Sequence, residues 1–194
     1  MTHMLDEPVF ISVDIETTGP TPYNGEILSI GAVPVHDRWK NLKSAPAFSM
    51  NLMQVTMAKS VDTMKWWEQW PLQWSRHRDG QQPPNVAMAQ FAKWLSDITA
   101  KPIFVAWPAA FDFGFINYYF WKHCSYNPFG YSPVCLKNFT LGKLNRPKAL
   151  IGNREEAEMP EGWLVTPEDI GLISHIALDD AIAQGYMLQH VLSD

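Results

Sequence analysis

The sequence predicts an α/β fold with a mixed central β-sheet, an antiparallel meander plus parallel strands, flanked by α-helices. Three apolar stretches of strand length follow one another at the start of the chain with turn-rich connections, a spacing typical of an antiparallel meander. A later, fully apolar stretch, Pro102–Trp107, is typical of a buried strand in a parallel pair. Segments with helical periodicity alternate with this strand, which predicts helices packed against the sheet.

The first strand of the meander is expected in the stretch Val9–Gly19, where it ends in the carboxylates Asp14 and Glu16, and the other two are expected at Glu26–Val35 and Ala45–Met53. The segment Thr18–Pro22 is rich in proline, threonine and glycine and is expected to be a loop. Pro34 cannot donate a ladder hydrogen bond, so it favours an edge or a strand end for the second strand.

The first strand carries two carboxylates, Asp14 and Glu16. Side chains alternate along a strand, so both acids project from one face while Val13 and Ile15 project from the other. Two acids held this close repel each other and lose water if the strand is central. A divalent cation would compensate for both effects, and the strand therefore predicts a metal site.

Two helices are expected between the meander and the next strand. The first is Asp62–Gln69, with Asp62 as its N-cap and Pro71 ending it. Three tryptophans in this helix and directly after it recur at helical spacing and form either a packed aromatic stripe or a base-stacking platform: Trp67, Trp70 and Trp74. The second helix is Asn85–Ile98, with Asn85 as candidate cap and its apolar side chains on one face.

A further helix, Ala109–His123, is expected directly after the strand Pro102–Trp107, with Pro108 in its first turn. Asp112 lies in this first turn among many aromatic residues. Stabilisation of an acid by the positive end of the helix dipole is one explanation for a carboxylate there. The other is a metal ligand at the end of a buried strand.

The region after this helix is expected to include a short helix within Pro133–Leu144, and it contains the basic stretch of the chain. Five cations occur there without an intervening acid: Lys137, Lys143, Arg146, Lys148 and Arg154. They form either a solvated loop or a patch that faces the substrate. The acidic residues that follow, up to Glu161, are expected in a surface loop.

The last element is a long amphipathic helix, Ser174–Leu192, with His175 and Asp180 near its start. These two residues lie about 140° apart on a regular helix, so only a histidine in the first turn could reach the same site as Asp180. Asp179 is a rival ligand because it lies four residues after His175. Small side chains would let this helix approach the strands closely: Ala177, Ala181 and Ala183.

Composition bounds the kind of protein. The 194 residues, 46% of them apolar, suit one domain over residues 1–194. No apolar run reaches the roughly 20 residues of a membrane helix. The absence of a signal-peptide pattern and the two cysteines predict a cytoplasmic protein with free thiols. A net charge of −5 argues against extended binding along nucleic acid, but allows an enzyme that holds a chain end through bound metal ions.

Three segments resemble, in order, the three motifs of the DnaQ-like, or DEDD, 3′–5′ exonucleases. Asp14-Ile15-Glu16-Thr17-Thr18-Gly19 resembles the first motif, and Ala109-Ala110-Phe111-Asp112 the second. His175-Ile176-Ala177-Leu178-Asp179-Asp180 is similar to the H-x-A-x-x-D motif of the DEDDh branch. The resemblance covers nearly the whole chain and implies a ribonuclease H-like fold.

Two further segments are similar to one subfamily, that of RNase AS and the DexA exonucleases: Asp62–Gln69 and Ala106–Ala109. The segment Leu136–Leu141 departs from the family pattern with Lys137 and Phe139, which leaves substrate preference open. Candidate substrate contacts, from these regions and from the first motif, are Thr17, Trp67, Trp107 and Lys137.

The resemblance implies hydrolysis of the terminal phosphodiester at the 3′ end of a nucleic acid, with release of nucleoside 5′-monophosphates. It implies four metal-binding acids, Asp14, Glu16, Asp112 and Asp180, which would hold two Mg²⁺ ions, or Mn²⁺ in their place. His175 would be the general base.

RNA, single-stranded or as a 3′ overhang, is the expected substrate because of the RNase AS-like segment. A deoxyribonuclease of proofreading or phage type and a noncatalytic nucleic-acid-binding module are the alternatives. A homodimer is a further expectation from the resemblance.

Overall fold

A computed structural model describes residues 5–145, 160 and 162–193. Its strands are β1 (Val9–Thr17), β2 (Ile27–Val35), β3 (Phe48–Asn51), β4 (Pro102–Ala106) and β5 (Val134–Cys135). Its α-helices are α1 (Val61–Trp67), α2 (Pro71–Arg76), α3 (Pro84–Ile98), α4 (Ala109–Cys124), α5 (Leu136–Lys143) and α6 (Ala177–Ser193). Two short 3₁₀ helices are η1 (Leu42–Ser44) and η4 (Glu168–Ile170).

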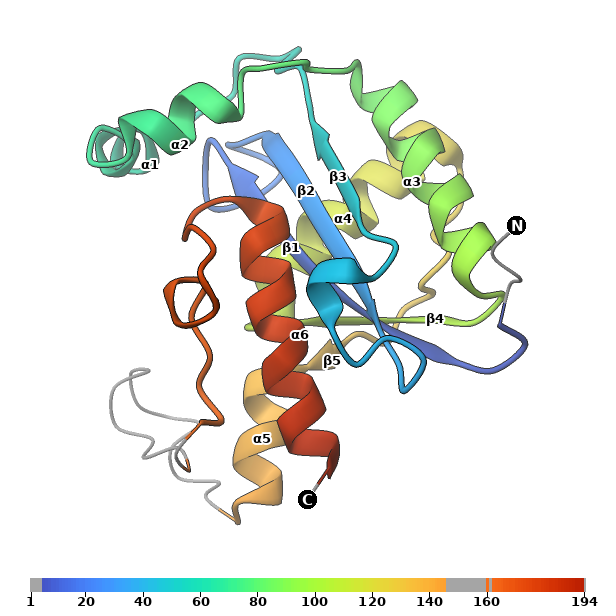
Figure 1. Cartoon of the computed structure of the whole chain (residues 1–194). Coiled ribbons are helices and arrows are strands. Elements are labelled where there is room, and N and C mark those ends of the chain that lie inside the picture. The colour runs from blue at the N-terminus through green and yellow to red at the C-terminus, as the bar shows by residue number, and fades with distance from the viewer. Residues whose placement is uncertain (1–4, 146–159, 161, 194) are drawn as a thin grey trace.

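The strands form one mixed sheet in the order β3-β2-β1-β4-β5 (Figure 1). β1, β2 and β3 pair antiparallel, and β4 and β5 continue the sheet in parallel on the other side of β1. The predicted meander and the parallel strand are therefore confirmed. Pro34 lies beyond the residues of β2 that pair with β3, so the expectation of a strand end is correct.

Helices cover both faces of the sheet (Figure 1). Val13 and Ile15 of β1 belong to a buried cluster with side chains of α3 and α4. The opposite face of β1 meets α6, where the buried hydroxyl of Ser12 donates a hydrogen bond of 2.8 Å to the carbonyl of Ala181. The alternation predicted for β1 thus directs its two acids toward the α6 side.

α6 approaches β2 closely at a glycine. A Cβ built on Gly31 would lie only 2.2 Å from backbone atoms of Ala177 and Leu178. Ala177 and Ala181 are themselves buried, as expected from their small size. Glycine in the strand and alanine in the helix together allow the start of α6 to lie against the sheet.

Several predicted boundaries are wrong for local reasons. Ser60, not Asp62, caps α1, because its side chain accepts from the backbone N–H of Thr63. Pro71 begins a second helix, α2, instead of only ending the first, since proline suits the first turn.

Other boundaries shift for similar reasons. α3 begins at Pro84, so Asn85 is inside the helix and does not cap it. Pro108 precedes α4 and is not in its first turn. The third strand is shorter than predicted, and β5 is too short for periodicity to reveal.

Cys124 and Cys135 are free thiols, as predicted. Among the described residues, no helix combines the length and the apolar character needed to span a membrane.

Candidate active site

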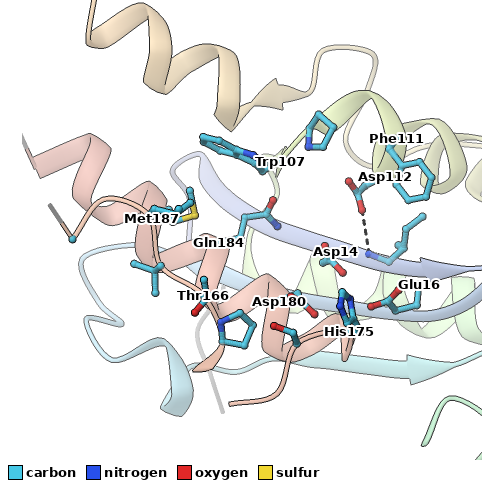
Figure 2. Close-up of a pocket in the computed structure, with 18 of the residues that line it drawn as sticks. Asp14, Glu16, Trp107, Phe111, Asp112, Thr166, His175, Asp180, Gln184 and Met187 are labelled. Carbon is cyan, nitrogen blue, oxygen red and sulfur yellow. Dashed lines mark hydrogen bonds between the residues drawn. The ribbon is translucent and has the colours of Figure 1, made fainter. Parts of the chain in front are cut away.

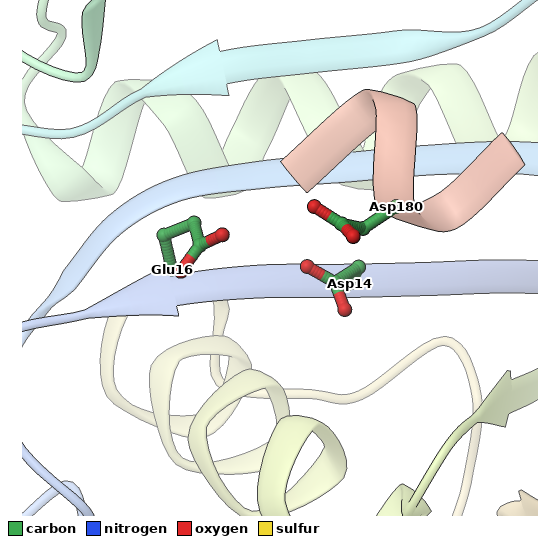
Figure 3. A group of neighbouring side chains, drawn as sticks. All are labelled: Asp14, Glu16 and Asp180. Atoms are coloured by element: carbon green, nitrogen blue, oxygen red, sulfur yellow. The ribbon is translucent and has the colours of Figure 1, made fainter. Parts of the chain in front are cut away.

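Three carboxylates converge between β1 and the start of α6. Asp14 and Glu16 project from the same face of β1, and Asp180 reaches them from the first turn of α6 (Figure 3). One oxygen from each of the three lies within 4.8 Å of the others. Because Asp180 follows the two acids of β1 by more than 160 residues in the sequence, only the packing of α6 on the sheet creates this cluster.

Asp112 joins this group from α4, on the other side of β1. Its side chain is 3% exposed, and it accepts a hydrogen bond of 3.2 Å from the backbone N–H of Ile15, between the two acids of β1 (Figure 2). Asp112 therefore lies at the N-terminal end of α4, as a dipole-stabilised acid would, and also beside the cluster.

The two acids at the start of α6 have different surroundings. Asp180 belongs to the carboxylate cluster and accepts a hydrogen bond of 3.1 Å from the backbone N–H of Ile176. Asp179 accepts instead from the backbone N–H of Ile173, at 3.0 Å, and so fixes the preceding loop. The structure thus places Asp180, and not its rival, in the cluster.

His175 lies before α6 and not in its first turn, in contrast to the sequence prediction. α6 begins at Ala177, and the φ angle of His175 is +64°, in the left-handed region. This backbone conformation turns the chain so that the imidazole and the carboxylate of Asp180 border the same cavity (Figure 2).

That cavity has a volume of about 790 Å³ and extends from the carboxylates along α6. Trp107, Gln184 and Met187 lie at the end away from the acids (Figure 2). Sequence reasoning missed the last two, although they follow Asp180 at helical spacings of four and seven residues, which could have revealed them. Gln184 is fixed by a hydrogen bond of 3.0 Å to the carbonyl of Val13.

The carboxylates hold their negative charge at a cost. Burial raises the pKa of Glu16 well above its ordinary value, and the charges of Asp180 and Asp112 raise it further. Burial also raises the pKa of Asp180 to about 7, although hydrogen bonds from the backbone N–H groups of His175 and Ile176 oppose the change. Closely spaced carboxylate oxygens of this kind suit a hard divalent cation, which would favour the charged form of both carboxylates.

The pKa of His175 is shifted in the opposite direction. Burial lowers the pKa of His175, while the charge of Glu168 acts in the opposite direction. A lowered pKa keeps the imidazole neutral near pH 7, and a neutral imidazole can accept a proton.

The candidate substrate contacts lie in different environments. Thr17 and Trp67 are buried, and the indole N–H of Trp67 donates to the carbonyl of Thr17 at 2.9 Å. Both nevertheless line a smaller pocket of about 260 Å³ next to Glu16. Trp107 lines the main cavity, whereas Lys137 is half-buried on α5 and lines neither pocket. Arg146, Lys148 and Arg154 of the basic stretch, and the acidic residues up to Glu161, lie outside the described residues.

Comparison with known proteins identifies the family of this chain. A family described as the 3′–5′ exoribonuclease Rv2179c-like domain matches residues 9–192. The 3′–5′ DNA exonuclease Cap18 of Escherichia coli is 31% identical over 192 residues, which cover 95% of this chain and 91% of Cap18.

Solved structures share the fold. The nuclease domain of 3′hExo, a DEDDh family member bound to rAMP, gives a TM-score of 0.61 at 13% identity, over 96% of this chain and 92% of that one. The zinc-bound complex of E. coli exonuclease I with single-stranded DNA gives 0.65 at 14% identity, over 97% of this chain. The present chain spans only 41% of exonuclease I. At such identities these likenesses concern the ribonuclease H-like fold alone.

The family match and the relative together define a 3′–5′ exonuclease. More narrowly, the chain belongs to the family of Rv2179c-like 3′–5′ exoribonuclease domains.

Proposed function

We propose that this chain removes nucleotides from the 3′ end of RNA, single-stranded or as a 3′ overhang, and releases nucleoside 5′-monophosphates. The observation that carries the proposal is the convergence of Asp14, Glu16 and Asp180 within 4.8 Å, beside a cavity that His175 also borders. Phosphodiester hydrolysis needs strong neutralisation of charge and a base for the attacking water, and this site offers ligands for the first and an imidazole for the second.

The four acids are the residues that would hold metal ions: Asp14, Glu16, Asp112 and Asp180. The raised pKa values of Glu16 and Asp180 indicate excess negative charge, which fits divalent cations. A ligand set made only of carboxylates favours Mg²⁺ or Mn²⁺. When bound, two such ions would activate water and stabilise the charge that develops on the phosphate and the leaving oxygen.

The side chains of this chain would carry the remaining steps. His175 would take a proton from the water that attacks the terminal phosphorus atom. The bond from that phosphorus atom to the 3′ oxygen of the preceding nucleotide breaks, and this oxygen gains a proton. The products are a nucleoside 5′-monophosphate and a strand that is one nucleotide shorter and ends in a 3′ hydroxyl.

A preference for RNA over DNA is supported by the family description, which names an exoribonuclease. Exodeoxyribonuclease activity is the second candidate, because Cap18, named a DNA exonuclease, shares 31% identity over nearly the full length. The choice depends on contacts with the ribose 2′-hydroxyl group.

The experiment is a comparison of two 5′-labelled oligonucleotides of one sequence, one RNA and one DNA, with Mg²⁺, with Mn²⁺ and with a chelator. We expect a ladder of products shortened from the 3′ end, formed faster from RNA and absent with the chelator. Faster shortening of DNA would select the second candidate. Intact strands under every metal condition would refute the proposed exonuclease activity. Binding of the oligonucleotides without turnover would favour a noncatalytic nucleic-acid-binding module.

A variant tests the role of the histidine. His175→Ala is expected to keep its affinity for Mn²⁺ and to lose about 100-fold to 10,000-fold in kcat, the usual contribution of a general base. Calorimetry measures the first quantity and the oligonucleotide assay the second. Full turnover in this variant would remove His175 from the reaction.

A further inference from the structure

His175 has a backbone conformation that neighbouring groups must stabilise. Its φ of +64° lies in the left-handed region, which is unfavourable for a residue with a side chain. α6 begins only at Ala177, so helical hydrogen bonding does not fix the residue. The position of the imidazole therefore depends on contacts with other parts of the chain.

Two tryptophans from α1 and the start of α2 contact the imidazole. The ring centroid of Trp66 lies 4.7 Å from that of His175, with the planes at 87°. The centroid of Trp70 lies 4.4 Å away, with the planes at 55°. Such contacts define the orientation of a ring as well as burying it. Both tryptophans precede the histidine by more than 100 residues, and in space α1 and α2 lie at the end of the molecule where α6 begins (Figure 1).

The backbone of the same residue is held by a second histidine. The Nε2 atom of His77 lies 3.0 Å from the carbonyl oxygen of His175, and because a carbonyl only accepts, Nε2 carries the proton. His77 is 2% exposed, and the loop receives another bond from Gln73, whose side-chain amide donates to the carbonyl of Ser174 at 3.3 Å.

His77 is connected to the strand that carries the acids. The ring of Trp67 packs against His77, with centroids 5.2 Å apart and planes at 73°. The indole N–H of Trp67 donates to the carbonyl of Thr17, the residue that follows Glu16. A continuous series of contacts therefore joins the end of β1 to the carbonyl of His175.

We propose that Trp66, Trp70 and His77 are positioning residues, which hold the imidazole of His175 in the orientation that the reaction needs. This inference rests on the proposed function, in which His175 accepts a proton. A general base must stay within hydrogen-bonding reach of the water, and a misplacement of about 1 Å can cost about 100-fold in rate. Loss of a positioning residue should therefore lower kcat and leave KM and metal affinity unchanged.

The test is a double-mutant cycle with His175→Ala. Trp66→Ala and His77→Leu are each expected to lower kcat by about 10-fold to 100-fold in the wild-type background. In the His175→Ala background each should lower it by less than about twofold, because the imidazole that they position is gone. His77→Gln can still donate to the carbonyl and should recover most of the loss caused by His77→Leu.

Two matched controls come from exposed positions. Leu72, 76% exposed on α2, and Trp121, 46% exposed on α4, are each replaced by alanine and should leave kcat unchanged. The metal-free protein provides an independent readout, since the nuclear magnetic resonance signals of the His175 ring should shift in Trp66→Ala, which removes the neighbouring indole.

Different results would refute the positioning role and the proposed function. Losses that multiply in the double variants would overturn the positioning role, as would an unchanged kcat in Trp66→Ala. If His77→Leu does not fold, Trp66→Ala decides alone, because Trp66 is 37% exposed and belongs to neither buried hydrophobic cluster of the described residues. A wild-type protein without metal-dependent turnover would instead refute the proposed function.

Discussion

Replacement of Gly31 by alanine is expected to weaken metal binding by the carboxylate cluster, although glycine has no side chain to offer. Gly31 pairs with Asp14 across β1 and β2, and its Cβ would lie 2.2 Å from backbone atoms at the start of α6. Ordinary contact begins at 3.4 Å, so α6 must retreat by about 1 Å. Asp180 lies in the first turn of α6 and must move with it.

The magnitude follows from how narrowly metal sites tolerate displacement. Ligand distances are held to about 0.2 Å, so a shift of about 1 Å in one of three clustered carboxylates is large. We expect Gly31→Ala to weaken Mn²⁺ affinity at least about tenfold and to lower the free energy of unfolding by about 1–3 kcal/mol, the usual cost of overpacking. Calorimetry with Mn²⁺ and urea unfolding measure the two effects.

Gly142→Ala provides the matched control. Gly142 lies in α5, and a Cβ built on it would meet nothing within 4 Å. Alanine is better than glycine inside a helix by about 0.5–1 kcal/mol, so this variant should be at least as stable as the wild type, with unchanged Mn²⁺ affinity. If Gly31→Ala binds Mn²⁺ as tightly as Gly142→Ala, the close approach of α6 does not set the geometry of the site.

Two further variants test the electrostatics and the packing around the site. The folded-state pKa values of Glu16 and Asp180 lie above their ordinary values, for Asp180 at about 7 instead of 3.8. Between the ordinary and the folded-state pKa values, the metal-free folded protein therefore holds protons that the unfolded chain has lost. The two acids lower the stability of the folded protein as the pH rises through this range. Glu16→Gln should therefore raise the Tm with a chelator at pH 8 much more than at pH 4, and an equal rise at both would contradict the charge explanation. Trp67→Phe removes the hydrogen bond of 2.9 Å to Thr17 but keeps an aromatic ring, and it should cost about 1–2 kcal/mol in urea unfolding. An unchanged free energy of unfolding would mean that this bond does not anchor α1.

The local sequence pattern predicted those features of the fold and the site that a single strand or helix determines. Alternation along β1 placed Asp14 and Glu16 on one face and Val13 and Ile15 on the other, and the structure has the same arrangement. Small residues at the start of the last helix predicted a close approach to the sheet, and Ala177 does contact the backbone of β2 at Gly31. Such features depend on the alternation of side chains along a strand or on side-chain volume, and both can be read from residues that are neighbours in the sequence.

Local pattern failed where distant contacts determine the conformation. Helical periodicity extended the last helix back to Ser174, but the chain turns at His175 through a left-handed residue and α6 begins at Ala177. The hydrogen bond from His77 and the rings of Trp66 and Trp70 compensate for this unfavourable backbone conformation. These three residues are about 100 residues away from His175 in the sequence. The tryptophan pattern predicted an aromatic stripe or a base-stacking platform, and neither interpretation includes a contact with the histidine of a later motif.

The site therefore depends on two sets of contacts, which meet at the hydrogen bond from the backbone N–H of His175 to Asp180. The approach of α6 to Gly31 brings Asp180 to the acids of β1, whereas α1 and α2 hold His175. Substitutions in the first set should change metal affinity before they change the orientation of the imidazole, and substitutions in the second should do the opposite. A Gly31→Ala protein saturated with Mn²⁺ should thus recover a larger share of its turnover than a Trp66→Ala protein under the same conditions, since metal can compensate for weak affinity but not for a misplaced base.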